Sequence, residues 1–282
     1  MTSEVLRREA EDEVSGMTDQ ADPVLSILMP VRNEGGSLSI VLKVLPPLIG
    51  ASYEILVVHD DLEDTSIPAA ESARADNPQV RVVHNRLGRG VINAVRAGVA
   101  TARGRYVMIF AADEIGPVFI IRDMLALMDE GCDLVSCTRY AHGGGRLGGS
   151  LLGRVLSTTA NFLFRSLTRS ALSDLTTGIK MFRRERFDEL GLESRPVGWA
   201  FAFEIAVKAE AAGWRLGEVP MVSIDRLFGG ASSFRPNPWI REYTRWFLWG
   251  VRHLRRNEQQ SSTVRIPHFR GSGAPASPAA PV

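Results

Sequence analysis

"RYVMIFAADEIGP", Arg105 to Pro117, is an apolar run that stops at two neighbouring carboxylates, Asp113 and Glu114, before a Gly-Pro pair. An apolar run bounded by such a turn signal is typical of a buried strand. Four similar runs lie around it: "VLSILMPV" from Val24, "YEILVV" from Tyr53, "VRVV" from Val80 and "CDLVSC" from Cys132. Because helical patterns separate these runs, the sequence predicts βαβ units and an open, doubly wound, mainly parallel α/β sheet.

Polar residues follow each predicted strand. They are Pro30-Val31-Arg32-Asn33-Glu34, His59-Asp60-Asp61, Asn85-Arg86, Asp113-Glu114 and Thr138-Arg139. In sheets of this kind, ligands bind beyond the carboxyl ends of the strands. Acids and arginines gathered at that edge would suit a phosphate-bearing ligand held together with a metal ion.

Each acidic group also has a simpler interpretation. Asp60, Asp61 and Asp64 would fit a turn before a helix that is capped at Thr65 or Ser66, an interpretation that explains Asp64 well and the other two acids poorly. Asp113 and Glu114 would fit the cap of a helix that Pro117 begins. The segment from Gly88 to Asn93 mimics a dinucleotide-binding loop. It follows the third strand and lacks a third glycine, so we expect no Rossmann cofactor there, although its glycines would allow a ligand to approach closely.

The composition excludes several classes of function. The 282 residues contain 33 Lys plus Arg and 32 Asp plus Glu, so no overall charge indicates a nucleic-acid partner. Two cysteines are too few for a disulfide framework or a thiolate metal site. The sequence shows neither the form of a signal peptide nor an apolar run of roughly 20 residues, so we expect a cytoplasmic protein.

The chain is predicted to have four parts: a disordered acidic lead-in (1–22), a folded body (23–234), an amphipathic helix (235–256) and a disordered tail (257–282). Within the body, the five glycines between Tyr140 and Ser150 predict a mobile loop before a helix from Leu151 to Leu167. We also expect a pair of strands around "WRLGEVPMVSI", which follows a helix through "FAFEIAVKAEAAG".

The C-terminal helical segment "NPWIREYTRWFLWGVRHLRR" divides its side chains between two faces. One face carries Trp239, Tyr243, Trp246, Phe247, Gly250 and Leu254, and another carries Arg241, Arg245, Arg252 and Arg256. This pattern predicts a helix that lies on the inner face of an anionic membrane. The alternative is a helix packed on the folded body, with its arginines in water.

Eight segments occur in an order typical of one enzyme family. They are "LSILMPVRNEGGSL", "YEILVVHDDLEDTS", "NRLGRGVINAVRAGVATARGRYVMIFAAD", "CDLVSCTRYAHGG", "LLGRVLS", "SDLTTGIKMFRRE", "GWAFAFEIAVKAEAAGWRLGEVPM" and "DRLFGGASSF". From about Val24 to Phe234 the chain resembles the inverting family-two glycosyltransferases of GT-A fold, and among them the dolichyl- or polyprenyl-phosphate mannosyl- and glucosyltransferases. The resemblance implies transfer of a hexose from a nucleotide diphosphate sugar to a polyprenyl phosphate.

The resemblance also implies roles for individual residues. The donor would be bound by Pro30, Arg32, Glu34, Asp60, Asp61 and Gly90, and the acceptor by Arg154, Glu204 and Ser232. Asp113, Arg139, Asp174 and Arg226 would be catalytic, and Asp113 and Glu114 would hold a divalent metal, Mg²⁺ or Mn²⁺.

Three positions depart from the family pattern. Ala111 replaces the first acid of the family's Asp-x-Asp, Ile115 replaces a common glutamine, and Ser233 replaces a common lysine. The metal requirement and the identity of the sugar therefore stay open. Two other functions remain: a glycosyltransferase with a soluble acceptor, or a catalytically degenerate scaffold that binds nucleotide sugars.

Overall fold

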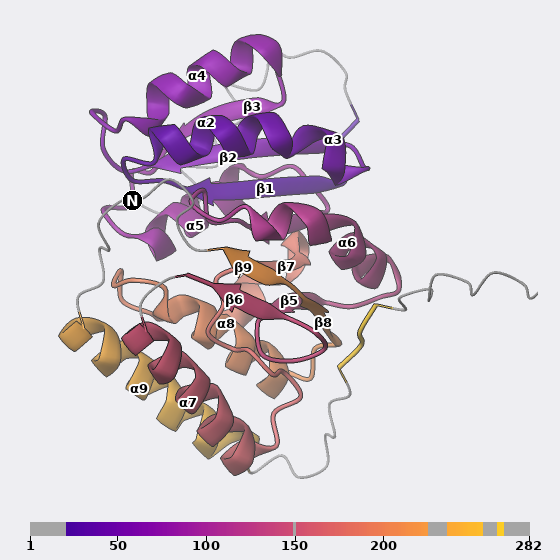
Figure 1. Cartoon of the computed structure of the whole chain (residues 1–282), viewed down its shortest axis with the longest axis vertical. Helices are drawn as coiled ribbons and strands as arrows, with labels where there is room; N and C mark the ends of the chain where they lie inside the picture. Colours follow the sequence, from indigo (N-terminus) through magenta and orange to yellow (C-terminus); the bar gives the residue numbers. More distant parts are fainter. Residues whose placement is uncertain (1–20, 149–150, 225–235, 256–263, 268–282) are drawn as a thin grey trace, which may run out of the picture.

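The computed structural model describes residues 21–148, 151–224, 236–255 and 264–267 (Figure 1). Its main sheet has seven strands in the order β3-β2-β1-β4-β7-β5-β8. Their bounds are β1 Leu25–Pro30, β2 Tyr53–His59, β3 Val80–His84, β4 Tyr106–Ile109, β5 Leu134–Thr138, β7 Lys180–Arg183 and β8 Leu216–Pro220. All neighbours pair in parallel except β7, which runs antiparallel between β4 and β5. The five predicted strands and the mixed, mainly parallel sheet are confirmed.

Helices cover both faces of this sheet. They are α2 Gly35–Val44, α3 Pro46–Ile49, α4 Ser66–Asp76, α5 Val91–Thr101, α6 Ile121–Asp129, α7 Leu151–Thr168, α8 Ala200–Ala211 and α9 Pro236–Leu254, with 3-10 turns η1 Gly116–Ile120 and η2 Arg184–Leu190. Side chains of α2, α4 and α6 belong to one buried cluster, and those of α5, α8 and α9 belong to a second. The sheet is therefore buried on both sides, which explains its nearly continuous apolar strands.

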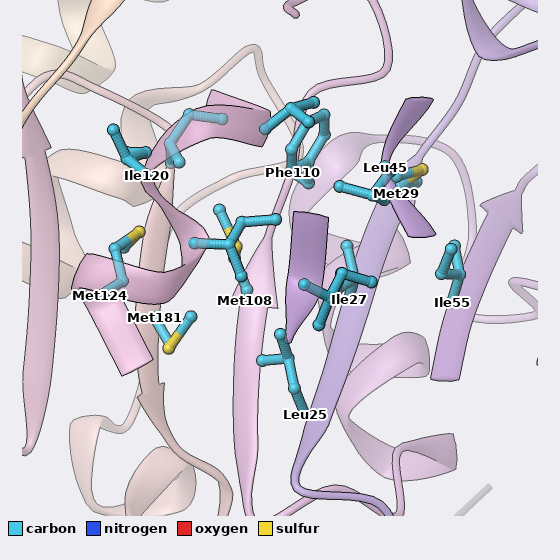
Figure 2. Packing of buried hydrophobic residues seen from close by; sticks show 14 of the residues in the cluster. Leu25, Ile27, Met29, Leu45, Ile55, Met108, Phe110, Ile120, Met124 and Met181 are labelled. Atoms are coloured by element: carbon cyan, nitrogen blue, oxygen red, sulfur yellow. The ribbon is translucent and has the colours of Figure 1, made fainter. Parts of the chain in front are cut away.

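Strand β1 shows how the sequence builds both clusters. Successive side chains of a strand point to opposite faces, so Leu25, Ile27 and Met29 enter the first cluster and Leu28 enters the second. Figure 2 shows Leu25 and Ile27 near Met108 of the neighbouring strand β4, and Met29 beside Leu45. This packing fixes the carboxyl ends of β1 and β4 next to each other.

One expectation about the segments after β5 is wrong. The glycine-rich segment, predicted to be a mobile loop, contains strand β6 (Gly145–Leu147), which pairs in parallel with β9 (Val222–Ile224). The two strands expected around "WRLGEVPMVSI" are present as β8 and β9, but they belong to different sheets, because β8 lies at the edge of the main sheet and β9 joins β6. Neighbouring strands thus separate at Met221, whose N–H donates to the carbonyl of Thr138 at 3.0 Å.

Helix α9 packs on the body of the protein through its aromatic face. Trp246 is 1% exposed, and the ring of Tyr243 meets that of Phe203 in α8 edge to face. A methyl group on Gly250 would lie 2.6 Å from Cζ of Phe164 in α7. The prediction that this face lies on a membrane is therefore wrong, and the alternative of a packed helix is confirmed. Among the described residues, no helix has the length and apolar character needed to cross a bilayer.

The two predicted disordered ends fall mostly outside the described residues. Residues 264–267 of the predicted tail are described, and there Arg265 forms a parallel bridge with Gly217 of β8. The N–H of Arg265 donates to the carbonyl of Leu216 at 3.0 Å. This short piece of the tail extends the main sheet, contrary to the prediction.

Candidate active site

The loop after β1 is fixed by the loop after β2. Asn33 adopts a φ of 59°, and its N–H donates to Oδ1 of Asp64 at 2.9 Å. The N–H of Glu34 donates to Oγ of Ser66 at 2.9 Å. The same Asp64 oxygen accepts the N–H of Ser66, so Asp64 serves as the turn-forming acid that the simpler interpretation required. Arg32 is exposed beside this junction, at the edge where the donor was predicted to bind.

Asp60 and Gly90, two residues predicted to bind the donor, meet at this edge. Oδ2 of Asp60 accepts the N–H of Gly90 at 2.9 Å, and its Oδ1 is buried with no hydrogen-bond partner among the described residues. Gly90 has a φ of 120°, and a methyl group there would lie 2.5 Å from Cβ of Pro196. Only glycine suits both the backbone conformation and the close approach.

Asp61 points to a different partner. It forms an ion pair with Arg89, and both side chains are partly exposed. The pKa of Asp61 is lowered because the N–H of Glu63 donates to its carboxylate and because Arg89 and Arg32 lie nearby. The glycine-flanked Arg89 thus brings a second guanidinium, besides that of Arg32, toward the predicted donor side.

Asp113 and Glu114 lie on a turn beyond β4, the middle strand of the sheet. The N–H of Glu114 donates to the carbonyl of Ala111 at 3.1 Å, which closes the turn. Oε1 of Glu114 accepts the hydroxyl of Ser223 in β9 at 2.7 Å. Ala111 and Ile115 pack against the first apolar cluster. Ala111 and Ile115 stand where the family that this chain resembles has polar residues, and here they contribute to the hydrophobic core.

Arg139 and Asp174 form a buried pair at the end of β5. Nε and Nη2 of Arg139 donate to the two carboxylate oxygens at 2.7 and 3.0 Å. Asp174 also accepts the hydroxyl of Thr176 at 2.9 Å and the amide of Asn161 at 3.2 Å. Burial alone would raise the pKa of Asp174, but Arg139 and Thr176 stabilise the carboxylate and lower its pKa below the ordinary value. Both oxygens of this acid are engaged.

A row of buried polar residues below this pair was not predicted. Nζ of Lys180 donates to Oγ of Ser136 at 2.9 Å, and Glu218 follows on the next strand. Burial lowers the pKa of Lys180 to about 8, even though Asp174 and Glu218 favour its charged form. Burial raises the pKa of Glu218, which accepts the N–H and hydroxyl of Ser173 at 2.7 and 2.8 Å. The one available signal was a lysine between apolar residues in "TTGIKMF".

The residues predicted to bind the acceptor are placed less uniformly. Arg154 is exposed on α7. Glu204 is fully buried in α8, where it accepts the N–H groups of Glu193 and Ser194 at 2.6 and 2.8 Å and pairs with Lys208 at 2.8 Å. Arg226 and Ser232 lie outside the described residues.

The acids at the sheet edge fit one kind of metal site only. Within the part of the chain that the structure describes, no three or more His, Cys, Asp or Glu side chains converge on a common point where an ion could be held. Mg²⁺, however, commonly takes one or two protein carboxylates and completes its shell with substrate phosphates and water. Asp113, on the turn beyond the central strand, fits such a site.

Comparison with known proteins identifies the family. The sequence profile described as glycosyl transferase family 2 matches residues 26–191. Two uncharacterized glycosyltransferases, one from Mycobacterium bovis and one from Mycobacterium tuberculosis, are each 32% identical over 213 residues, which cover 75% of this chain and 90% of theirs.

Solved structures agree with this fold. Glucosyl-3-phosphoglycerate synthase from M. tuberculosis, in complex with Mn²⁺, UDP-glucose and phosphoglyceric acid, has a TM-score of 0.63 and 17% identity over 86% of this chain and 83% of its own. The same enzyme with Mg²⁺ and UDP has a TM-score of 0.60 and 18% identity over 87% and 83%. From its sequence and its GT-A fold, the chain belongs to glycosyl transferase family 2 and is a glycosyltransferase.

Proposed function

We propose that this enzyme transfers a hexose, with inversion, from a nucleotide diphosphate sugar of the GDP-mannose or UDP-glucose type to a polyprenyl phosphate at the inner face of the membrane. The proposal rests on the hydrogen bonds and the lowered pKa of Asp174. Its oxygens are occupied by Arg139, Thr176 and Asn161, and its pKa is lowered, so it is a poor general base. A lipid phosphate is already an anionic nucleophile and needs no base.

The donor would bind across the edge formed by β1, β2 and β4. Asp60 has one carboxylate oxygen without a hydrogen-bond partner among the described residues, and a nucleoside hydroxyl would satisfy it. Asp113 would hold a divalent cation on the pyrophosphate. When bound, that cation would stabilise the charge that develops on the departing nucleoside diphosphate.

The acceptor would bind on the side of α7. This helix contacts the buried pair directly, because the amide of Asn161 donates to Asp174 and the hydroxyl of Ser157 accepts from Arg139 at 3.5 Å. The opposite side of α7 exposes large apolar residues, among them Leu151 and Leu152. An isoprenoid chain that extends from this site across α7 would reach this apolar surface.

A soluble phosphorylated acceptor is the second candidate. It is favoured by the structural likeness to a synthase whose complexes contain phosphoglyceric acid. In that case Arg139 would orient a small phosphate or carboxylate, and the transfer to a hydroxyl would need a base that Asp174 does not provide.

The deciding experiment offers both acceptors to the purified enzyme. Radiolabelled GDP-mannose and UDP-glucose are each incubated with polyprenyl phosphate or with 3-phosphoglycerate, with Mg²⁺, with Mn²⁺ or with chelator. We expect label in the organic phase only when polyprenyl phosphate is present. Label that stays in water and requires 3-phosphoglycerate would establish the second candidate, and no transfer to either would reject both.

Two variant pairs test the assigned residues. Asp174→Asn should abolish transfer, whereas Asp133→Asn alters a buried acid on the opposite end of β5 and should preserve it in the folded protein. Asp113→Ala should abolish metal-dependent donor binding in calorimetry, whereas Glu114→Ala should reduce it less, because Glu114 is bonded to Ser223. Equal losses in the second pair would assign the metal to both acids.

A further inference from the structure

Helix α7 is oriented with its apolar side outward. Leu151 and Phe162 are 75% and 69% exposed, while Asn161 and Phe164 on the opposite side are buried. The residues on the outward side are Leu151, Leu152, Val155, Leu156, Phe162 and Leu163. A helix that only packs on its own domain turns its apolar side inward, so this continuous surface indicates a partner that the folded domain does not supply.

The charges around this surface have one sign. Helix α7 contains Arg154 and Arg165 and no acidic residue. Beside it, α9 turns Arg241 and Arg252 outward, and its one acid, Glu242, is buried and paired with Arg245. Figure 1 shows the two helices side by side. Between them Phe164 packs against Phe247, with the centroids of the two rings 5.3 Å apart. The two helices thus form one layer that is apolar at its centre and basic at its margins.

The layer also contains a recess near the end of α7. Its volume is about 430 Å³, and its lining residues are Phe162, Arg165, Ser166, Arg169 and Ser170. The two guanidinium groups suit a phosphate, and the exposed phenyl ring beside them suits an acyl chain. The hydroxyls of Ser166 and Ser170 already donate to the carbonyl of Phe162 and to Glu210, so the arginines provide the donors for a phosphate. This combination matches the chemistry of an anionic phospholipid at the level of its head group.

We infer that the outward side of α7, with this recess, docks the enzyme on an anionic lipid bilayer. The apolar side chains enter the boundary between head groups and acyl chains, and the arginines meet lipid phosphates. A second copy of the chain fits less well. A two-fold interface sets the same patch against itself, and α7 would then oppose arginines without any acid to compensate them. Membrane contact thus lies on α7 rather than on α9, whatever the acceptor of the transfer.

Vesicle flotation of the full chain tests this surface. The vesicles contain phosphatidylcholine with or without phosphatidylglycerol, and no polyprenyl phosphate, so a negative result is independent of the transfer assay. We expect the protein to float with the anionic vesicles and to be released as salt rises. Phe162→Ser should weaken binding about tenfold through lost apolar burial, and Phe162→Leu should largely preserve it.

Matched variants distinguish docking through α7 from nonspecific adsorption to vesicles. Phe119 in η1 is 68% exposed, almost the same as Phe162, so Phe119→Ser is the control that should leave vesicle binding unchanged. Arg165→Gln and Arg169→Gln should each weaken binding about fivefold. Absence of binding to anionic vesicles, or equal losses from Phe119→Ser and Phe162→Ser, would overturn the inference. A dimer in light scattering that Phe162→Ser dissociates would overturn it in favour of a second copy.

Discussion

Lys180 provides a quantitative test of how the site is built. Its ammonium group is fully buried, donates to Ser136 and is flanked by Asp174 and Glu218. Burial lowers the pKa of Lys180 from 10.5 to about 8, because these partners only partly replace water. The unfolded chain therefore holds this proton more tightly than the folded protein does.

The difference between the folded and unfolded pKa of Lys180 sets the sign and size of its effect on stability. At about 1.4 kcal/mol per pKa unit, the lowered pKa corresponds to a cost of about 3 kcal/mol in the free energy of unfolding. The cost is fully present below pH 8. It disappears as the pH rises from about 8 to 10.5, because the folded protein loses the proton first. The contribution of Lys180 to the free energy of unfolding therefore becomes more favourable as the pH rises from about 8 to 10.5.

The assay is urea unfolding of the wild type and of Lys180→Met between pH 7 and 10.5. Methionine keeps the length of the side chain and removes the charge, so the difference in unfolding free energy between the two proteins should change by about 3 kcal/mol over this range. Lys208→Met, which removes a lysine that pairs with Glu204, is the control for the loss of a lysine side chain as such. A difference that stays constant with pH would refute this account of Lys180.

Three further predictions concern packing and pairing. Gly90→Ala should destabilise the protein by about 1–3 kcal/mol and weaken donor binding, measured by thermal unfolding and calorimetry, because its methyl group meets Pro196 at a φ of 120°. Gly250→Ala should cost a similar amount by pushing on Phe164, without changing donor affinity. Asp174→Asn should cost about 3–5 kcal/mol at pH 7 in urea unfolding. That loss should shrink below about pH 4. The pKa of Asp174 is lower in the folded protein than in the unfolded chain, so its contribution to stability is present above the unfolded pKa and is lost as acid protonates the carboxylate.

The strands and the sheet edge were predictable because their signals are local. Five apolar runs with turn residues after them gave β1 to β5, and the acids beyond them followed from the geometry of parallel sheets. Strand β7 was missed because it begins and ends with a charged residue, Lys180 and Arg183, and follows a segment without periodicity. Lys180 was missed with it, since only the pairing of β7 between β4 and β5 reveals that this lysine is buried beside Ser136. The contact of Asp60 with Gly90 likewise requires the folded chain.

Helices α7 and α9 show the limit of a periodic pattern. Both carry an apolar face, and the sequence alone assigned lipid to α9. The side of the domain formed by α8 accepts one such face fully, and α9 occupies it with Trp246, Tyr243 and Phe247. Aromatic side chains bury more area than leucines, so this arrangement removes the larger apolar surface from water. Helix α7 is held instead by Phe164 and by the polar contacts of Asn161, and its leucines face outward. A hydrophobic helix face therefore indicates that the face is buried against something. Because α9 already covers the side of the domain formed by α8, the apolar face of α7 is left to bind a partner outside the folded domain.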